Sequence, residues 1–161
     1  MNAMNNSSIE SLRLVDVELV ASLHGRCFFD AWDPKTISEI LKMAGAFGLV
    51  SRGAGAQSIS GFAIARVAAE ECELLTLGVA PESRAIGFGA QLLQATMTRA
   101  VVEKAKWIFL EVSENNLAAL RLYKSYGFLK VGNRPQYYEN ADGTRSDAYT
   151  MRVALPTLTF C

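Results

Sequence analysis

The stretch VAPESRAIGFGAQLL, residues 79–93, joins the end of a strand-like run, a glycine-rich turn and the start of a helical pattern. Gly87 and Gly89 lie between the apolar run ECELLTLGV and a segment whose apolar residues follow helical spacing. Glycines leave room for a phosphate, and the backbone N–H groups and the positive end of the helix would face it. The stretch therefore predicts a turn that binds an anion, and the question is which one.

Two common phosphate-binding motifs do not fit this turn. A P-loop requires Lys followed by Ser or Thr after its glycines, and neither pair follows here. A dinucleotide fingerprint requires a third glycine or alanine where Leu92 stands, and it belongs in the first strand–helix unit of a fold. The glycines alone leave a third interpretation, a tight turn that holds no ligand.

The flanking patterns predict a mixed α/β (α+β) sheet. A short first strand is expected around Leu12 and Leu14, and Asp16 and Asp33 are expected to start two helices. Gly127 is expected to end the last helix. The run at 107–112 is apolar enough to predict a strand covered on both faces. The remaining elements are strands at 46–52, 59–69, 71–79, 128–134 and 147–155, helices at 87–105 and 115–126, and a hairpin turn at 53–58.

This order of elements predicts parallel pairing across the central strand–helix–strand unit and antiparallel pairing in the hairpins on either side. The sheet should contain about six to seven strands with about four helices. Residues 1–8 are expected to form a flexible N-terminus, and residues 9–161 a single domain.

The composition limits the classes of partner. Lys plus Arg and Asp plus Glu each number 16 in 161 residues, which argues against a nucleic-acid partner bound by bulk charge. No apolar run approaches the roughly 18 residues that cross a bilayer, and no secretory signal pattern begins the chain, so no membrane partner is expected.

The cysteines and the single histidine suggest no metal site. Cys27, Cys72 and Cys161 are widely spaced and are typical of reduced thiols in a cytoplasmic protein, with Cys72 in the core. His24 is expected to be a surface or capping residue of its helix. No metal-ligand spacing is present, so no metal is predicted.

Two motifs resemble the GNAT superfamily of N-acetyltransferases. Residues 84–89, RAIGFG, fit the Q/R-x-x-G-x-G/A loop that binds the pyrophosphate of coenzyme A in that superfamily. Downstream, LEVSENNLAALRLYKSYGF at 110–128 fits its Asn-x-x-Ala-x-x-Leu-Tyr-x-x-x-Gly-Phe pattern. The resemblance implies the GNAT fold and acetyl-CoA as co-substrate. It implies cofactor contacts from Leu77, Gly78, Val79, Arg84, Ala85, Ile86, Gly87, Phe88, Gly89, Ala90, Asn116, Ala119 and Tyr123.

Within the superfamily, residues 9–155 are most similar to the ribosomal-protein alanine N-acetyltransferases, which acetylate the N-terminal alanine of small-subunit protein S18. FFDAWDPKTI, WIFLEVSENN and PQYYENADGTRSDAYTM carry this resemblance. The sequence departs from it at Ala85, where a basic residue is frequent, and at Glu139, which replaces the proline after Tyr137 and Tyr138. The first departure removes one phosphate contact but leaves the backbone cradle, and the second alters the substrate loop.

The resemblance implies direct transfer of the acetyl group to an amine, with a base and an acid. Glu111 is the candidate base, because burial in an apolar strand would raise its pKa; the alternatives are pairing with a nearby arginine or exposure at the strand end. Tyr123 is the candidate acid, and a core aromatic is its alternative. Asn116 would contact pantetheine, the Val79 N–H would contact the thioester carbonyl, and Gly78 would permit strand distortion.

The acceptor is expected to be the N-terminal peptide of a ribosomal protein, S18, bound by a monomer or weak dimer. Trp32, Tyr137 and Tyr138 are candidate walls of the peptide groove. Transfer to a small amine such as an antibiotic, polyamine or amino acid is the alternative, and a non-catalytic acyl-CoA sensor is a third possibility. Acidic residues could line the exit, although a solvated surface charge is the favoured interpretation of each: Glu70, Glu71, Glu73, Glu139 and Asp142.

Overall fold

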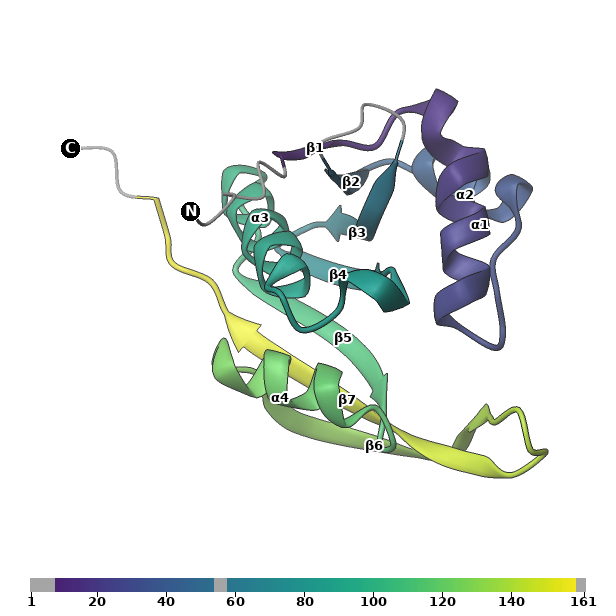
Figure 1. Ribbon diagram of the computed structural model, residues 1–161. Helices are drawn as coiled ribbons and strands as arrows, with labels where there is room; N and C mark the ends of the chain where they lie inside the picture. The colour runs from purple at the N-terminus through teal and green to yellow at the C-terminus, as the bar shows by residue number, and fades with distance from the viewer. Residues whose placement is uncertain (1–7, 54–57, 159–161) are drawn as a thin grey trace, which may run out of the picture.

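The computed structural model describes residues 8–53 and 58–158. Its mixed sheet has seven strands in the order β1-β2-β3-β4-β5-β7-β6 (Figure 1). The strands are β1 (Ser8–Ser11), β2 (Ala46–Arg52), β3 (Ile59–Ala68), β4 (Glu71–Val79), β5 (Trp107–Ser113), β6 (Leu129–Glu139) and β7 (Arg145–Ala154). The helices are α1 (Val17–Cys27), α2 (Pro34–Leu41), α3 (Phe88–Val102) and α4 (Leu117–Ser125). The predicted fold class and order of elements are confirmed.

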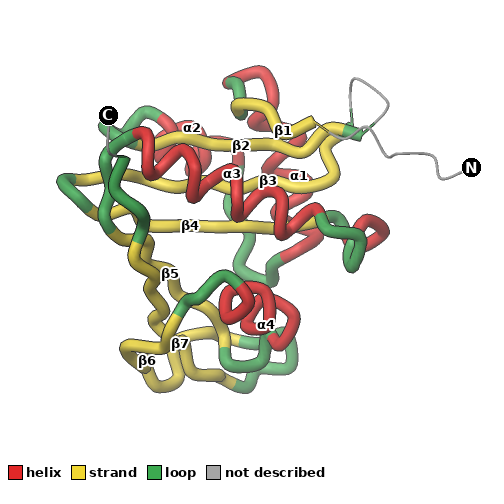
Figure 2. The backbone as a smooth tube through the Cα atoms, turned by 90° about the vertical axis from the view of Figure 1, so that its left-hand side faces the viewer, coloured by secondary structure: helices red, strands yellow, loops and turns green. Residues whose placement is uncertain are grey.

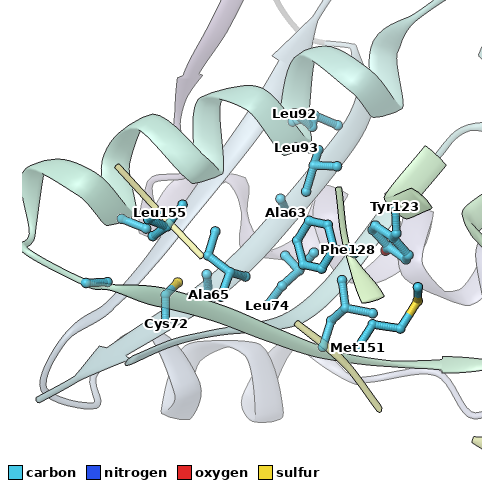
Figure 3. Close-up of a cluster of buried hydrophobic side chains, with 14 of the residues drawn as sticks. Ala63, Ala65, Cys72, Leu74, Leu92, Leu93, Tyr123, Phe128, Met151 and Leu155 are labelled. Atoms are coloured by element: carbon cyan, nitrogen blue, oxygen red, sulfur yellow. The ribbon is translucent and has the colours of Figure 1, made fainter. Parts of the chain in front are cut away.

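The helices cover the two faces of the sheet in pairs. Helices α1 and α2 lie on one face, and α3 and α4 lie on the other (Figures 1 and 2). Each pair buries its own apolar cluster: Val20, Ile37 and Phe62 belong to the α1/α2 side, whereas Leu92 and Tyr123 belong to the α3/α4 side (Figure 3). The two faces therefore have separate cores.

Strands β4 and β5 pair in parallel, with α3 as the crossover between them, and the other neighbouring strands pair antiparallel, as predicted. The pairing of β4 with β5 runs only from Glu71↔Trp107 to Leu74↔Leu110. A β-bulge shifts the register of β4 against β3 between Thr76 and Leu74, directly after the last pair. Because a bulge bends and twists its strand, β4 turns away from β5 beyond this point. The sheet is thus split at the ends of these two strands.

The first strand was predicted around Leu12 and Leu14, but the structure has it at Ser8–Ser11. Leu14 begins a short 3-10 helix, Leu14–Asp16, and is 66% exposed. Asp16 precedes α1 but does not cap it with its side chain. Its buried carboxylate instead lies 2.8 Å from the Arg52 guanidinium. Burial would raise the pKa of Asp16, but hydrogen bonds from Arg52 and Arg13 outweigh burial and lower it to about 2.

Other boundaries differ from the prediction for local reasons. Strand β5 alternates between buried and half-buried residues, so the expectation that both faces are covered was wrong. Helix α3 ends at Val102 rather than near 105, with Lys104 at a φ of 66°. Strand β6 continues through the Tyr137-Tyr138 segment, so the hairpin is longer than predicted. Ser8 belongs to β1, while residues 1–7 and most of the predicted turn at 53–58 lie outside the described residues.

Asp33 and Gly127 have the predicted roles. The Asp33 carboxylate accepts a hydrogen bond from the Thr36 N–H at 2.7 Å and caps α2. Gly127 ends α4 with a φ of 88°. Among the described residues, no helix is both long enough and apolar enough to cross a membrane.

Candidate active site

The end of β4 presents an open strand edge to the split. The Ala80 N–H donates to the Ser60 carbonyl at 2.8 Å, so this residue pair is hydrogen-bonded across β3 and β4. Bonded and non-bonded pairs alternate in antiparallel strands, so the backbone groups of Val79 and Leu77 point away from β3. On that side β5 has already separated from β4. The Val79 carbonyl accepts hydrogen bonds from Cys27 Sγ at 3.4 Å and Arg84 Nε at 3.2 Å. An extended ligand could therefore pair with the Leu77 backbone and the Val79 N–H as an added strand.

Gly78 has a different role from the one predicted. Its register partner is Phe62, and a Cβ at Gly78 would lie 2.6 Å from the Phe62 ring and 3.2 Å from the Cys27 sulfur. Gly78 is thus required because the Phe62 ring packs against the backbone. The strand distortion that we assigned to Gly78 comes instead from the bulge at Leu75.

The glycine-rich loop supplies a set of free backbone donors. Within the described chain, the N–H groups of residues 86–90 make no hydrogen bond to protein, and the first one of α3 joins the Gln91 N–H to the Gly87 carbonyl. Gly87 precedes α3 with a φ of 96°, a conformation that favours glycine. A Cβ at Gly89 would lie 3.4 Å from Leu122 of α4. These donors and the helix N-terminus suit an anionic group.

The loop contains one unexpected backbone conformation. Ala85 has a φ of 63°, in the left-handed region. It stands at the position where the resembled family frequently has a basic residue. Arg84 is exposed and turns back toward β4, where its Nε donates to the Val79 carbonyl at 3.2 Å. Ile86 is also exposed, whereas Phe88 is buried beneath the loop. The loop therefore buries Phe88 and leaves the Arg84 and Ile86 side chains exposed beside its free N–H groups.

Glu111 points to the other face of the sheet. Ile108, Leu110 and Val112 belong to the α3/α4 core, so Glu111, which alternates with them, faces the α1/α2 side. Its side chain remains 27% exposed and lies 3.1 Å from the Arg134 guanidinium of β6. The pairing with an arginine that we left open as an alternative is present, and the role of Glu111 as a base stays a prediction.

Tyr123 lies on the α3/α4 face. It is 6% exposed and packs on Phe128, with ring centroids 5.6 Å apart (Figure 3). Burial raises the pKa of Tyr123, and the nearby Tyr138 raises it further. Burial also raises the pKa of Tyr138 to about 12, with Glu111 as the next cause. Tyr138 therefore lies near enough to Glu111 and Tyr123 for their charges to interact.

Asn116 begins α4, as its sequence position suggested. Its Oδ1 accepts a hydrogen bond from the Ala119 N–H at 3.2 Å and so caps the helix. Both residues lie at the start of the helix that carries Tyr123. The Tyr126 hydroxyl near the end of α4 donates to the Ala90 carbonyl at 3.4 Å, which ties α4 to the glycine-rich loop.

Residues 28–33, here termed the acceptor loop, join α1 to α2 and carry Trp32. The Trp32 ring stacks on His24, with centroids 5.0 Å apart and planes at 15°. His24 is only 2% exposed, so its prediction as a surface or capping residue was wrong. The helical position of His24 could have been read as the buried face, since it lies four residues after Val20.

Strands β6 and β7 carry a bulge next to the two candidate groove tyrosines, Tyr137 and Tyr138. Three residues of β6, 135–137, lie opposite the single residue Asp147 of β7, and Gln136 has a φ of 52°. The Asp147 carboxylate accepts from the Gln136 N–H at 2.9 Å and from the Asn133 amide at 3.1 Å. Asp147 thereby holds the bulge that precedes Tyr137 and Tyr138. Sequence reasoning missed Asp147, because its role depends on strand register.

Two further hydrogen bonds connect this bulge to the end of β5. The Asp147 N–H donates to the Glu114 carboxylate at 2.9 Å, and the Glu114 N–H donates to the Asp147 carbonyl at 3.0 Å. Tyr137 packs edge-on against Tyr138, and the Arg134 guanidinium lies 5.0 Å from the Tyr137 ring. The two tyrosines, Arg134 and Glu111 thus form one group of side chains.

Most of the acidic residues that could line the exit of the acceptor groove do not lie near the site. Glu70, Glu71 and Glu73 lie at the opposite end of β4, and Glu73 is about 20 Å along the strand from Val79. Glu70 pairs with Lys106 at 2.8 Å. Asp142 accepts two hydrogen bonds from Thr144 within the turn. Only Glu139, exposed beside Tyr138, remains near the site. Over residues 8–53 and 58–158, no group of three or more potential metal ligands occurs.

The site therefore has two sides that meet at the split in the sheet. One side carries the free N–H groups of the glycine-rich loop and the buried Tyr123 hydroxyl. The other carries Glu111, the acceptor loop and the β6–β7 bulge. Such an arrangement can hold an extended anionic cofactor from one face and admit a second substrate from the other.

Comparison with known proteins gives a consistent result. The model of the acetyltransferase (GNAT) family matches residues 17–128. The N-alpha-acetyltransferase RimI of Mycobacterium tuberculosis is 32% identical over 151 residues, which cover 90% of each chain. A ribosomal protein bS18-alanine N-acetyltransferase of Escherichia coli K12 is 31% identical over 151 residues, covering 93% of this chain and 97% of its own. The crystal structure of the ribosomal-protein-S18-alanine N-acetyltransferase from Escherichia coli superposes with a TM-score of 0.85 at 26% identity, covering 96% of each chain.

Proposed function

The chain belongs to the acetyltransferase (GNAT) family, and on that premise we propose that it transfers an acetyl group from acetyl-CoA to the N-terminal alanine of ribosomal protein S18. The observation that carries the proposal is the open edge of β4, which lies between the glycine-rich loop and Glu111. Relatives that act on this substrate align over nearly the whole chain, including the acceptor loop and the β6–β7 hairpin.

The residues of the cofactor side fit coenzyme A. The N–H groups of residues 86–90 would bind its pyrophosphate, helped by the dipole of α3. The backbone of Leu77 and Val79 would pair with pantetheine, as an added strand does. The Asn116 amide nitrogen could donate a hydrogen bond to pantetheine as well, since only the amide oxygen is used in capping α4. Acetyl-CoA supplies the activated thioester, and the Val79 N–H would stabilise charge on its carbonyl oxygen.

The two candidate proton-transfer groups lie on opposite faces of the sheet, so each would reach the reacting atoms through the split between β4 and β5. Glu111 would take the proton of the attacking amine, which forms the new C–N bond as the C–S bond breaks. Tyr123 would donate its hydroxyl proton to the departing thiolate. A tyrosine hydroxyl is protonated at neutral pH even at its ordinary pKa of about 10, so Tyr123 carries the proton that this step needs. Burial raises the pKa of Tyr123 further, so the donated proton would have to pass to a thiolate held close to the hydroxyl. The phenolate would recover its proton from solvent once the products leave.

The acceptor groove would lie between the acceptor loop and the β6–β7 bulge. Trp32 forms one wall and Tyr137 and Tyr138 form the other, with Glu139 beside them. Glu111 lies at the base of this space, where the Arg134 guanidinium now neutralises it. An N-terminal ammonium entering the groove carries the same charge as Arg134 and would replace it next to the carboxylate.

The proposal is tested by acetyl-CoA turnover on a hexapeptide that begins Ala-Arg, compared with polyamines and aminoglycosides. We expect acetylation of the peptide α-amine, identified by mass spectrometry, and much slower reaction with the small amines. A peptide of the same composition with a blocked N-terminus is the control and should not react. Turnover of small amines alone would reject the S18 assignment and favour the alternative of a small-molecule acetyltransferase.

A further inference from the structure

The only histidine of the chain, which has no role in the proposed chemistry, is buried within a group of aromatic rings. His24 lies 4.6 Å from Phe28, 5.0 Å from Trp32 and 5.5 Å from Phe62, measured between ring centroids. Its Nδ1 accepts a hydrogen bond from the Trp32 backbone N–H at 3.1 Å. Its Nε2 lies 3.2 Å from the Thr76 hydroxyl of β4. A buried imidazole with both nitrogens engaged has a defined orientation.

The partners of the ring determine its tautomer. A backbone N–H can only donate, so Nδ1 must carry the lone pair and the proton must lie on Nε2. The Nε2–H then donates to the Thr76 oxygen. Burial lowers the pKa of His24 to about 4, against a smaller opposing effect of Asp30, so the ring is neutral at pH 7. Protonation would place a second N–H at Nδ1 against the Trp32 N–H and break that contact.

His24 also holds the acceptor loop at both ends. Within the described chain, two backbone hydrogen bonds join residues 28–32 to the rest of the protein. The Phe28 N–H donates to the His24 carbonyl at 2.9 Å, and the Trp32 N–H donates to the His24 ring. On the other side, the ring contacts Thr76, which lies between the bulge in β4 and the Val79 edge. His24 thus links the loop to the strand that forms the split.

We infer that His24 is a positioning residue for the acceptor: its neutral Nε2–H tautomer fixes the Trp32 backbone relative to β4 and so sets one wall of the acceptor groove. This inference rests on the proposed function of that groove. Because His24 and Trp32 lie on the α1/α2 side, loss of the link should weaken acceptor binding. Acetyl-CoA binding should change little, since its proposed contacts are backbone groups at the β4 edge and the loop before α3.

Three variants separate this role from simple packing. His24→Phe keeps an aromatic ring between Phe28 and Trp32 but removes both hydrogen bonds. His24→Gln keeps an acceptor for the Trp32 N–H and a donor for Thr76, so it should restore much of the function. Thr76→Val removes the partner of Nε2 alone. Thr96→Val is the matched control, because Thr96 is also buried and bonds only to Leu92 within α3.

The experiment measures kcat, the KM of the Ala-Arg peptide, the KM of acetyl-CoA and the Tm for each variant. For His24→Phe we expect a peptide KM raised about tenfold, the effect of losing the hydrogen bond that holds the Trp32 N–H, with the acetyl-CoA KM within about twofold of wild type. His24→Gln should lie close to wild type and Thr76→Val between the two. A lower Tm with an unchanged peptide KM in His24→Phe would reduce His24 to a packing residue and overturn the inference.

Two measurements do not depend on activity. In ¹⁵N-labelled protein the single imidazole should show the proton on Nε2 and no protonation above about pH 5; a proton on Nδ1 would contradict the inference. The Trp32 amide should exchange with solvent faster in His24→Phe but not in Thr96→Val. If the wild type does not acetylate the peptide, the proposed function fails, and these two measurements still decide whether His24 holds the loop.

Discussion

The cofactor side and the acceptor side of the site are built from different materials. Most of the proposed contacts of the cofactor side are backbone groups from two short segments, residues 77–79 and 86–90, that are close in the sequence, and α4 adds the side chains of Asn116 and Tyr123. The acceptor side consists of side chains from three distant segments, around Trp32, Glu111 and Tyr138. A backbone site needs glycine at set positions and leaves a short motif. A side-chain site depends on contacts between distant segments, so it has almost no motif in the sequence.

The most severe test of this comparison removes the candidate base. Glu111→Gln keeps the size of the side chain but cannot accept the amine proton, so kcat/KM should fall about 1,000-fold, within the usual range for acid–base catalysis. Calorimetry should show unchanged acetyl-CoA binding, since Glu111 lies on the acceptor side. Glu73→Gln, on the same sheet but at the far end of β4, is the control and should behave as wild type. Equal activity in both variants would exclude Glu111 as the base.

Acid should affect the acceptor side through His24. The pKa of His24 is about 4 in the folded protein, below its ordinary value of 6.5, because burial disfavours the charged ring. The unfolded chain binds a proton first, so stability is full above about pH 6.5 and decreases as the pH falls toward 4. The loss should reach up to about 3 kcal/mol, or about 150-fold in the unfolding equilibrium. Urea unfolding of wild type and His24→Gln between pH 7 and 4 measures this loss of stability. If the free energy of unfolding falls with pH by the same amount in both proteins, the lowered pKa of His24 is contradicted.

Removing the candidate acid should have a smaller effect. Tyr123→Phe loses only the hydroxyl and keeps the contact with Phe128, so kcat should fall about 100-fold while acetyl-CoA still binds. The control is Tyr149→Phe on β7, which should retain full activity. Normal turnover by Tyr123→Phe would leave this tyrosine as a core aromatic only.

The backbone nature of the cofactor side is tested at Gly87. Gly87→Ala forces an alanine to a φ near 96°, at a cost of about 1–2 kcal/mol, and should raise the acetyl-CoA KM about tenfold. Gly143→Ala is the matched control, because Gly143 also has a positive φ and open space around it but lies in the β6–β7 turn. Both variants should lose stability, and only Gly87→Ala should bind the cofactor less tightly. Similar acetyl-CoA KM values in the two variants would refute the backbone cradle.

The smallest expected effect concerns the bulge beside Tyr137. Asp147→Ala removes the acceptor for the Gln136 N–H and the Asn133 amide, so the peptide KM should rise about fivefold with the acetyl-CoA KM unchanged. Asp142→Ala, which removes a carboxylate that also bonds to backbone in the same hairpin, is the control. A rise in the acetyl-CoA KM for Asp147→Ala would show that the two sides are not independent.

Much of the fold could be predicted because its signals are local. Apolar runs marked β4 and β5, Asp33-Pro34 marked the start of α2, and Gly127 marked the end of α4. The first strand could not be located, because the apolar Leu12 and Leu14 resemble a strand while Leu14 is exposed in a 3-10 turn. The boundary there depends on Asp16 pairing with Arg52, which lies far along the chain.

The sequence by itself determined the order of elements, the glycine-rich loop and the positions of Glu111 and Tyr123, because backbone conformation and periodicity are encoded within a few residues. Only the tertiary structure decided that Gly78 makes room for Phe62, that Arg134 neutralises Glu111, and that His24 is buried against Trp32. The first two contacts depend on the bulge in β4 and the register of β6 and β7, and the third depends on how α1 packs on the sheet. A shift of one residue in either strand pairing would send Arg134, or the residues of β4 beyond the bulge, to the opposite face, and no local pattern specifies that register.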